Sequence, residues 1–310
     1  MMKRHTQRAG DISGLFDNTD PELVWEMTSD IIRLISPNYD FTLVQKVYKD
    51  VLRVFYGEFP GYGPIRTLYH DISHTLEVYM CGVRLMHGVH VSGEQLKDDE
   101  ITLMMLAILM HDIGYAQHRG EETGTGAQFT RTHVQRGIEF MRQYFTERML
   151  PSDILVDVTG MILGTEHFRP FAQIGFKDKR TRMLAQIVAT ADIVGQMADR
   201  KYLEKLLFLF QEFKEAQFGS YQNLFDMLRQ TDKFYLMSRD KLEGVLGGTY
   251  KKLEYHFSAT VGEQKNYYLE SIEKNMAYLK RLVSSGEAEI FTLLKRNGIR
   301  ESAITFNELT

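Results

Sequence analysis

The sequence contains one cysteine, few prolines and no excess of basic residues. The single cysteine, Cys81, cannot form an internal disulfide, and this indicates a reducing compartment such as the cytoplasm. There are 6 prolines in 310 residues, which favours helices because proline breaks them. The 37 Lys and Arg residues stand against 41 Asp and Glu residues, for a net charge of -4. That balance argues against a dedicated nucleic-acid-binding protein.

Long hydrophobic runs are also absent, which bears on membrane association. The strongest run, Ile101 to Met110, is interrupted only by Thr102 and falls far short of the roughly 20 residues of a membrane-spanning helix. Residues 1–10 are polar and basic and lack the apolar stretch of a signal peptide. We therefore expect no membrane association, and we interpret Ile101 to Met110 as a helix buried in the core of a cytoplasmic protein.

Apolar residues recur at helical spacing along the chain, whereas strand-like alternation is rare. The first such stripe follows Asp20-Pro21, an N-cap residue and a proline that typically open a helix. The sequence predicts an all-α, multi-helix bundle: a flexible N-terminal tail over residues 1–19, then a single helical domain over residues 20–310. The clearest stripes are Leu23, Met27, Ile31 and Leu34; Val44, Val47, Val51 and Phe55; Leu184, Ile187, Val188 and Ala191; and Tyr268, Ile272, Met276 and Leu279.

Two histidines, His70 and His74, stand four residues apart. On a helix this spacing places both imidazoles on one face, about one turn apart. Ile72 and Leu76 belong to an adjacent apolar stripe, so we expect both histidines to border the core. Such a pair suits metal binding. Two histidines that are hydrogen-bonded within the core are an equally good interpretation at this point.

A carboxylate follows the apolar helix at His111-Asp112, at the edge of a dry core. An unpaired buried carboxylate costs several kcal/mol, so a cation should meet it, and the neighbouring turns hold no arginine or lysine. Asp192 presents the same problem within the apolar segment from Ile187 to Val194. Neutral imidazole and carboxylate suit a divalent metal, so His74, His111, Asp112 and Asp192 form a candidate ligand set. A helix end that faces solvent would also account for His111-Asp112.

The order of these four residues resembles a known signature. His74, His111-Asp112 and Asp192 follow the H…HD…D order of the HD superfamily of metal-dependent phosphohydrolases. Flanking segments are similar to motifs of class I cyclic nucleotide phosphodiesterases, and the resemblance runs over about residues 20–285. These segments are Tyr69 to Val78, which resembles the Y-H-N-x-x-H-x-x-x-V stretch; Leu109 to Tyr115, which resembles the second motif; and Met161 to His167, which resembles the I-L-x-T segment.

The resemblance implies an HD-type catalytic domain that hydrolyses a phosphoester, with a cyclic nucleotide phosphodiester as the leading candidate. His74, His111, Asp112 and Asp192 would hold the first of two divalent ions, and Asp112 would also reach the second. Mn, Fe, Zn, Mg, Co and Ni all remain open. A metal-bound hydroxide would attack phosphorus, and His70 would protonate the leaving oxygen as general acid. The expected partner is a small-molecule phosphoester rather than a nucleic acid.

The match is less complete where the family binds substrate. Asp71 replaces the asparagine of the family, and Tyr115 stands near the position of a further histidine. Gln264 and Tyr267 resemble the glutamine and the aromatic clamp that hold the purine, and their spacing places them on one helical face. An ordinary amphipathic helix with an exposed glutamine and a packed tyrosine would show the same pattern. The sequence therefore leaves the identity of the substrate open.

Two further histidines, His133 and His167, are candidates for a second metal ion or for the phosphate, because some HD proteins use extra histidines in this way. A surface position is an equally good interpretation of His133. The extra histidines keep a di-iron oxygenase open as an alternative function. A nucleotide monoesterase, a triphosphohydrolase or a catalytically silent nucleotide-binding regulator would also fit the sequence. The sequence does not indicate an oligomeric state.

Overall fold

The computed structural model describes residues 19–167 and 169–294, and this part of the chain is helical. No strand forms within these residues, where Tyr62 and His118 make an isolated β-bridge. The predicted all-α, multi-helix bundle is therefore confirmed, whereas the predicted tail lies outside the described residues except for Thr19. The helices are α1 (Pro21–Ile35), α2 (Thr42–Phe55), α3 (Ile72–Val91), α4 (Asp98–Met110), α5 (His133–Glu147), α6 (Ser152–Leu163), α7 (Lys179–Ala198), α8 (Tyr202–Glu215), α9 (Leu224–Glu243), α10 (Leu253–Val261), α11 (Tyr267–Ser285) and α12 (Ile290–Leu293).

Aspartate N-caps determine where two of the helices begin. At α1 the Asp20 carboxylate accepts hydrogen bonds from the backbone N–H groups of Glu22 and Leu23, and Pro21 is the first helical residue, as predicted. At α3 the Asp71 carboxylate accepts from the backbone N–H of His74 at 2.9 Å, so the helix begins at Ile72. The prediction that His70 and His74 share one helical face is therefore wrong, because the cap leaves His70 in the bend before the helix.

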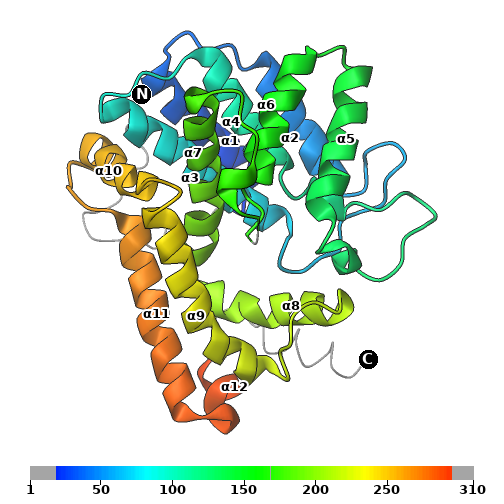
Figure 1. The fold of residues 1–310 in the computed structure, drawn as a ribbon, viewed down its shortest axis with the longest axis vertical. Coiled ribbons are helices and arrows are strands. Elements are labelled where there is room, and N and C mark those ends of the chain that lie inside the picture. Colours follow the sequence, from blue (N-terminus) through cyan, green and yellow to red (C-terminus); the bar gives the residue numbers. More distant parts are fainter. Residues whose placement is uncertain (1–18, 168, 295–310) are drawn as a thin grey trace.

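The core is built around α3, which is buried along most of its length. It packs most extensively on α7 and also contacts α1, α4 and α10 (Figure 1). The apolar run of α4, from Ile101 to Met110, is almost entirely buried, as the sequence predicted. These helices carry the ends and turns from which the candidate site is built, so its ligands are fixed by the best-packed part of the molecule.

Helices α9 and α11 lie side by side and extend away from this core towards α12 (Figure 1). Helix α8 runs across their direction and contacts both of them as well as α7. Within the described residues, no helix is both long and apolar enough to cross a lipid bilayer.

Candidate metal centre

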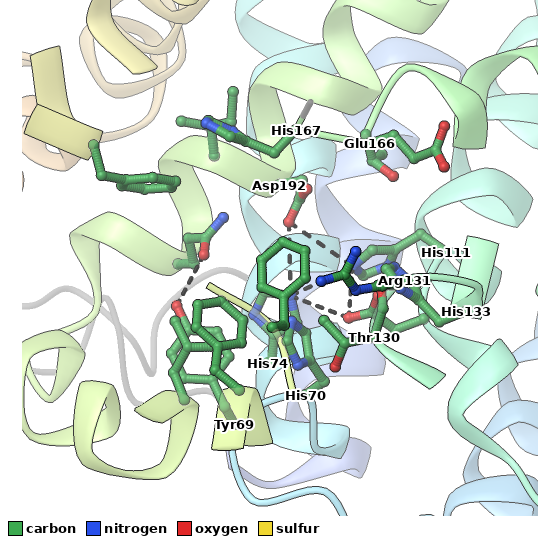
Figure 2. A pocket seen from close by; sticks show the side chains of 18 of the residues that line it. Tyr69, His70, His74, His111, Thr130, Arg131, His133, Glu166, His167 and Asp192 are labelled. Atoms are coloured by element: carbon green, nitrogen blue, oxygen red, sulfur yellow. Dashed lines mark hydrogen bonds and ion pairs between the residues drawn. The ribbon is translucent and has the colours of Figure 1, made fainter. Parts of the chain in front are cut away.

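The four predicted ligands lie close together, and Figure 2 shows three of them, His74, His111 and Asp192. The Nε2 atoms of His74 and His111 are 3.4 Å apart, and the Asp112 Oδ2 atom lies 3.4 Å from the first and 3.2 Å from the second. The Asp192 Oδ1 atom lies 3.6 Å from His74 Nε2 and 3.9 Å from His111 Nε2. The ligand atoms of His74, His111 and Asp112 all lie within 4.8 Å of one another and form a compact group that could hold a metal ion. Asp192 joins this group through its approach to the two histidines.

Each ligand is positioned by a helix or by its end. His74 lies in the first turn of α3, His111 is the C-cap of α4 with Asp112 next to it, and Asp192 lies within α7. The first three side chains are buried, and Asp192 is partly exposed to the cavity described below. The contacts of α3 with α4 and α7 hold these positions together.

The hydrogen bond of His111 fixes which of its nitrogens faces the centre. Its Nδ1 donates to the backbone carbonyl of Ile108 at 2.7 Å, so Nε2 points its lone pair at the other ligands. His133, the first residue of α5, follows the same arrangement, since its Nδ1 donates to the Thr130 carbonyl at 2.8 Å. Metal-binding histidines are typically oriented in this way, by a second ring nitrogen that is bonded to a carbonyl or a carboxylate.

The buried atoms of the centre fit a metal ion. Asp112 Oδ2 is buried and makes no hydrogen bond, although both histidine Nε2 atoms are close. Burial raises the pKa of Asp112, but His111 and the other histidines outweigh it and hold that pKa well below the ordinary value. Burial lowers the pKa of His111, yet Asp112 raises it overall, to about 9. A divalent cation would satisfy the carboxylates and both imidazoles at once.

Glu212 on α8 is a site residue that the sequence does not indicate, and it positions the predicted general acid. Its Oε2 atom lies 2.6 Å from His70 Nδ1, and its Oε1 atom accepts from the backbone N–H of Tyr69 at 2.6 Å. Burial lowers the pKa of His70, but Glu212 outweighs it and raises that pKa overall. With Nδ1 held by Glu212, Nε2 is the ring nitrogen of His70 left for the cavity. No local sequence pattern marks Glu212, which stands between Gln211 and Phe213.

His133 and Tyr115 extend the centre beyond Asp112. The Nε2 atom of His133 lies 3.5 Å from Asp112 Oδ1, so Asp112 stands between two groups of nitrogen ligands. The Tyr115 ring stacks on His133 at 4.7 Å and on His70 at 4.8 Å between centroids. His133 is thus brought to the site rather than to the open surface. The ring stack leaves no signal in the sequence, because the three residues are far apart along the chain.

The close approach of α5 to the His-Asp turn depends on Gly114, in the short helix η2 (Ile113–Tyr115). A Cβ atom on Gly114 would lie only 1.8 Å from the backbone carbonyl oxygen of His133. The Arg136 side chain ties the same two segments together by donating to the Gly114 and Ala116 carbonyls. The glycine after His111-Asp112 therefore allows His133 to reach Asp112.

The remaining predicted site residues lie away from the four ligands. His167 lines the cavity beside the Phe234 ring, at 4.6 Å between centroids, on the far side of Asp192 from His133 in Figure 2; burial lowers its pKa to about 4. Gln264 is exposed, and Tyr267 packs on Phe257 of α10. Neither Gln264 nor Tyr267 lines the cavity at the metal centre, so the structure does not bring the expected purine clamp to it.

A cavity of about 590 Å³ opens onto the centre. Its lining includes the four candidate ligands, His70, Tyr115 and His133 at one end, and side chains of α8 and α9 at the other. A space of this size accommodates a small organic molecule together with the group that contacts the ligands. The chemistry available at the ligand end is metal binding, proton donation by His70, and contact with an anion by Arg131 at the rim.

Comparison with protein families gives one match. A family model described as Npun_R2479-like matches residues 61–242, more than half of the chain. The matched residues include the four candidate ligands, His70, His133 and Glu212. A comparison with curated proteins found no match. The chain belongs to the Npun_R2479-like family.

Proposed function

We propose that this protein is an HD-type, metal-dependent phosphohydrolase, in which His74, His111, Asp112 and Asp192 bind a divalent ion. One observation carries the proposal. The Nε2 atoms of His74 and His111 lie 3.4 Å apart, and a carboxylate oxygen of Asp112 and one of Asp192 lie within 3.9 Å of His111 Nε2. The Asp112 oxygen is buried and makes no hydrogen bond. The order of these residues in the sequence, which resembles the HD superfamily, points to the same chemistry.

A divalent ion bound here would neutralise the phosphate charge and lower the pKa of a water molecule. The protein supplies the proton for the leaving oxygen from His70, whose Nδ1 is held by Glu212. General acid catalysis of this kind contributes about 10²–10⁴-fold to a rate. Arg131 lines the cavity near the same residues and provides a cation for a phosphate oxygen.

His133 supports a second ion as part of this proposal. Its Nε2 atom and the nearby Asp112 Oδ1 atom provide a nitrogen and an oxygen ligand on the other side of the same carboxylate. Asp112 would then bridge the two ions. The resemblance of the motifs points to a cyclic nucleotide phosphodiester, but Gln264 and Tyr267 do not line the cavity and supply no base clamp there.

The test combines metal analysis with a panel of phosphoesters. Protein loaded separately with Mn, Fe, Zn, Mg, Co or Ni is assayed on bis-nitrophenyl phosphate and on cyclic and linear nucleotides. We expect metal-dependent turnover that is lost in Asp112→Ala together with most of the bound metal. Asp157→Asn is the matched control, because Asp157 is another buried carboxylate, on α6, paired with Lys177.

The outcomes separate catalysis from binding alone. Stoichiometric metal without turnover on any phosphoester would contradict a phosphohydrolase and favour a silent regulator. Loss of metal from Asp157→Asn to the same degree as from Asp112→Ala would contradict the assignment of the ligands.

A di-iron oxygenase is the second candidate, because His133 adds a nitrogen ligand beside the second oxygen of Asp112. Iron-loaded protein prepared without oxygen would then show an optical or Mössbauer change when oxygen is admitted. Unchanged spectra together with phosphoester turnover would remove this candidate.

A further inference from the structure

The end of the cavity away from the ligands is a chamber of apolar and aromatic side chains. It is formed by α8, α9 and the segment between them, and we call it the aromatic chamber: Leu209, Phe213, Phe218, Tyr221, Met227 and Phe234. All of these except Met227 are only partly buried, although they line a cavity inside the fold. Apolar surface left open in this way favours a ligand that removes it from water.

The rings of the aromatic chamber form walls rather than isolated contacts. Phe213 and Tyr221 are stacked, with centroids 5.8 Å apart and planes 13° apart. Phe218 packs on Phe213 at 4.9 Å, and the Arg131 guanidinium lies 5.2 Å from the Phe218 ring. On the other side His167 and Phe234 are 4.6 Å apart. The chamber therefore offers ring faces and edges to a ligand that extends from Arg131 and the metal centre.

The charge of the lining limits the number of phosphates in such a ligand. Among the described lining residues the arginines are Arg131 and Arg169, and no lysine is present. Arg169 forms an ion pair with Glu166, which also lines the cavity, so that pair adds no net charge. Arg131 and the metal centre suit a single phosphate group. A polyphosphate would place further negative charges beside the aromatic chamber, where no arginine or lysine of the described lining compensates them.

Two amide side chains of the lining, Gln196 and Gln230, are each engaged at one end within the protein. The Gln196 side-chain oxygen accepts from the Tyr69 hydroxyl at 2.8 Å, and the Gln230 amide donates to Asp226 at 3.0 Å. Among the six side chains of the aromatic chamber, Tyr221 alone carries a hydroxyl or amide group. The chamber therefore favours a group recognised by its shape and apolar surface over one recognised by hydrogen bonds.

We propose that the substrate carries one phosphate and a bulky, apolar organic group, preferably with an aromatic ring, which binds in the aromatic chamber. This inference rests on the proposed phosphohydrolase function for the position of the phosphate. The proposed substrate carries less negative charge than a nucleoside polyphosphate, and its organic group is more apolar than that of a cyclic nucleotide.

The experiment measures the binding of stable phosphonates to full-length, metal-loaded protein by calorimetry. Methylphosphonate, phenylphosphonate and 2-naphthylphosphonate share the acidic group and differ in apolar size; cyclic AMP and ATP are the nucleotide probes. We expect the affinity to rise by at least about 10-fold from the methyl to the naphthyl compound, because ring contacts of this kind supply that factor. Cyclic AMP and ATP should bind more weakly than the naphthyl compound.

Two conservative variants test whether the aromatic chamber causes the increase. Phe234→Leu should lower the affinity for 2-naphthylphosphonate by about 3- to 10-fold and leave the affinity for methylphosphonate unchanged. Phe225→Leu is the matched control, because Phe225 is a partly buried phenylalanine of α9 that does not line the cavity. It should bind every probe like the wild-type protein.

The possible failures are distinguishable from one another. Equal affinity for all three phosphonates, or tightest binding of ATP or cyclic AMP, would overturn the apolar-substrate inference and leave the phosphohydrolase proposal intact. A second outcome is that the protein binds 2-naphthol, that Phe234→Leu weakens this binding, and that no phosphonate binds. The aromatic chamber would then remain an apolar binding site, but the proposed position of the phosphate would be wrong. An equal effect of Phe225→Leu and Phe234→Leu would also overturn the inference, because the effect would not come from the cavity.

Discussion

Replacement of Glu212 by glutamine tests the positioning of the general acid. The glutamine keeps the shape of the side chain, and its carbonyl oxygen can still accept from the Tyr69 backbone N–H, as Glu212 Oε1 does at 2.6 Å. Its NH₂ group would then face His70 Nδ1, where the carboxylate now lies at 2.6 Å. An NH₂ group cannot accept a hydrogen bond from Nδ1–H, so His70 loses the contact that fixes its tautomer and orientation.

The expected magnitude follows from the role of that contact. A positioned general acid is worth about 10²–10⁴-fold, so Glu212→Gln should lower kcat by about 10²-fold on an ester with a poor leaving group. The loss should be below about 10-fold on a nitrophenyl ester, which needs little protonation as it leaves. Removal of one charge-assisted hydrogen bond from a buried position should also lower the free energy of unfolding by about 1.5–3 kcal/mol. Denaturant titration measures this second effect separately.

A double-mutant cycle decides whether Glu212 acts through His70. His70→Ala should retain metal and show the same dependence on leaving group, and the double variant His70→Ala/Glu212→Gln should be no slower than His70→Ala alone. An additional loss of about 10²-fold in the double variant would refute this, as would equal losses on both esters. Glu215→Gln is the control, because Glu215 lies one turn further along α8 and accepts from Thr125 instead.

Three further predictions concern the metal, the fold around it and the response to acid. Asp192→Ala should lower metal occupancy in elemental analysis, and unchanged metal content would contradict its assignment as a ligand. Gly114→Ala should displace α5 and reduce both the melting temperature and metal binding, because its Cβ would meet the His133 carbonyl, whereas Gly137→Ala has ordinary contacts and should be neutral or stabilising in thermal melts. Burial raises the pKa of Asp50, but hydrogen bonds from Tyr144, Arg148 and Arg53 hold that pKa below its ordinary value overall. Stability from Asp50 is therefore present above about pH 4 and lost as the pH falls through the lowered pKa, so Asp50→Asn should have a smaller drop in melting temperature across this range than the wild type.

The fold class and the proximity of the first four candidate ligands could be predicted because both leave a local record in the sequence. Apolar spacing gives the helices, and a carboxylate at the end of an apolar helix needs a compensating cation wherever the chain places it. Asp112 follows the end of α4 and Asp192 lies within the apolar stretch of α7, and a carboxylate oxygen of each lies within 3.9 Å of the His74 and His111 Nε2 atoms. Burial was thus sufficient to predict the convergence of groups that are far apart in sequence.

The parts that the sequence did not reveal depend on contacts between distant residues. The spacing of His70 suggests a helical partner of His74, but the Asp71 cap starts the helix two residues later. Glu212 shows nothing unusual in its neighbourhood, and its importance follows from where α8 crosses the segment before α3. The Gln264 and Tyr267 pair has the spacing of a base clamp, while the packing of Tyr267 on Phe257 makes it a helix–helix contact. Spacing alone could not separate these cases.

Helix α8 connects the two halves of the proposed site. Glu212 contacts the His70 ring through its carboxylate, and the next residue of the helix, Phe213, forms part of the aromatic chamber. A ligand that presses on Phe213 would therefore act on the same turn of helix that orients His70, the proposed general acid. The candidate metal ligands lie instead on α3, at the C-terminal end of α4 and on α7. Substitutions at Phe213 would mix substrate binding with proton donation. Phe234, on α9, allows the aromatic chamber to be tested without moving the residue next to Glu212.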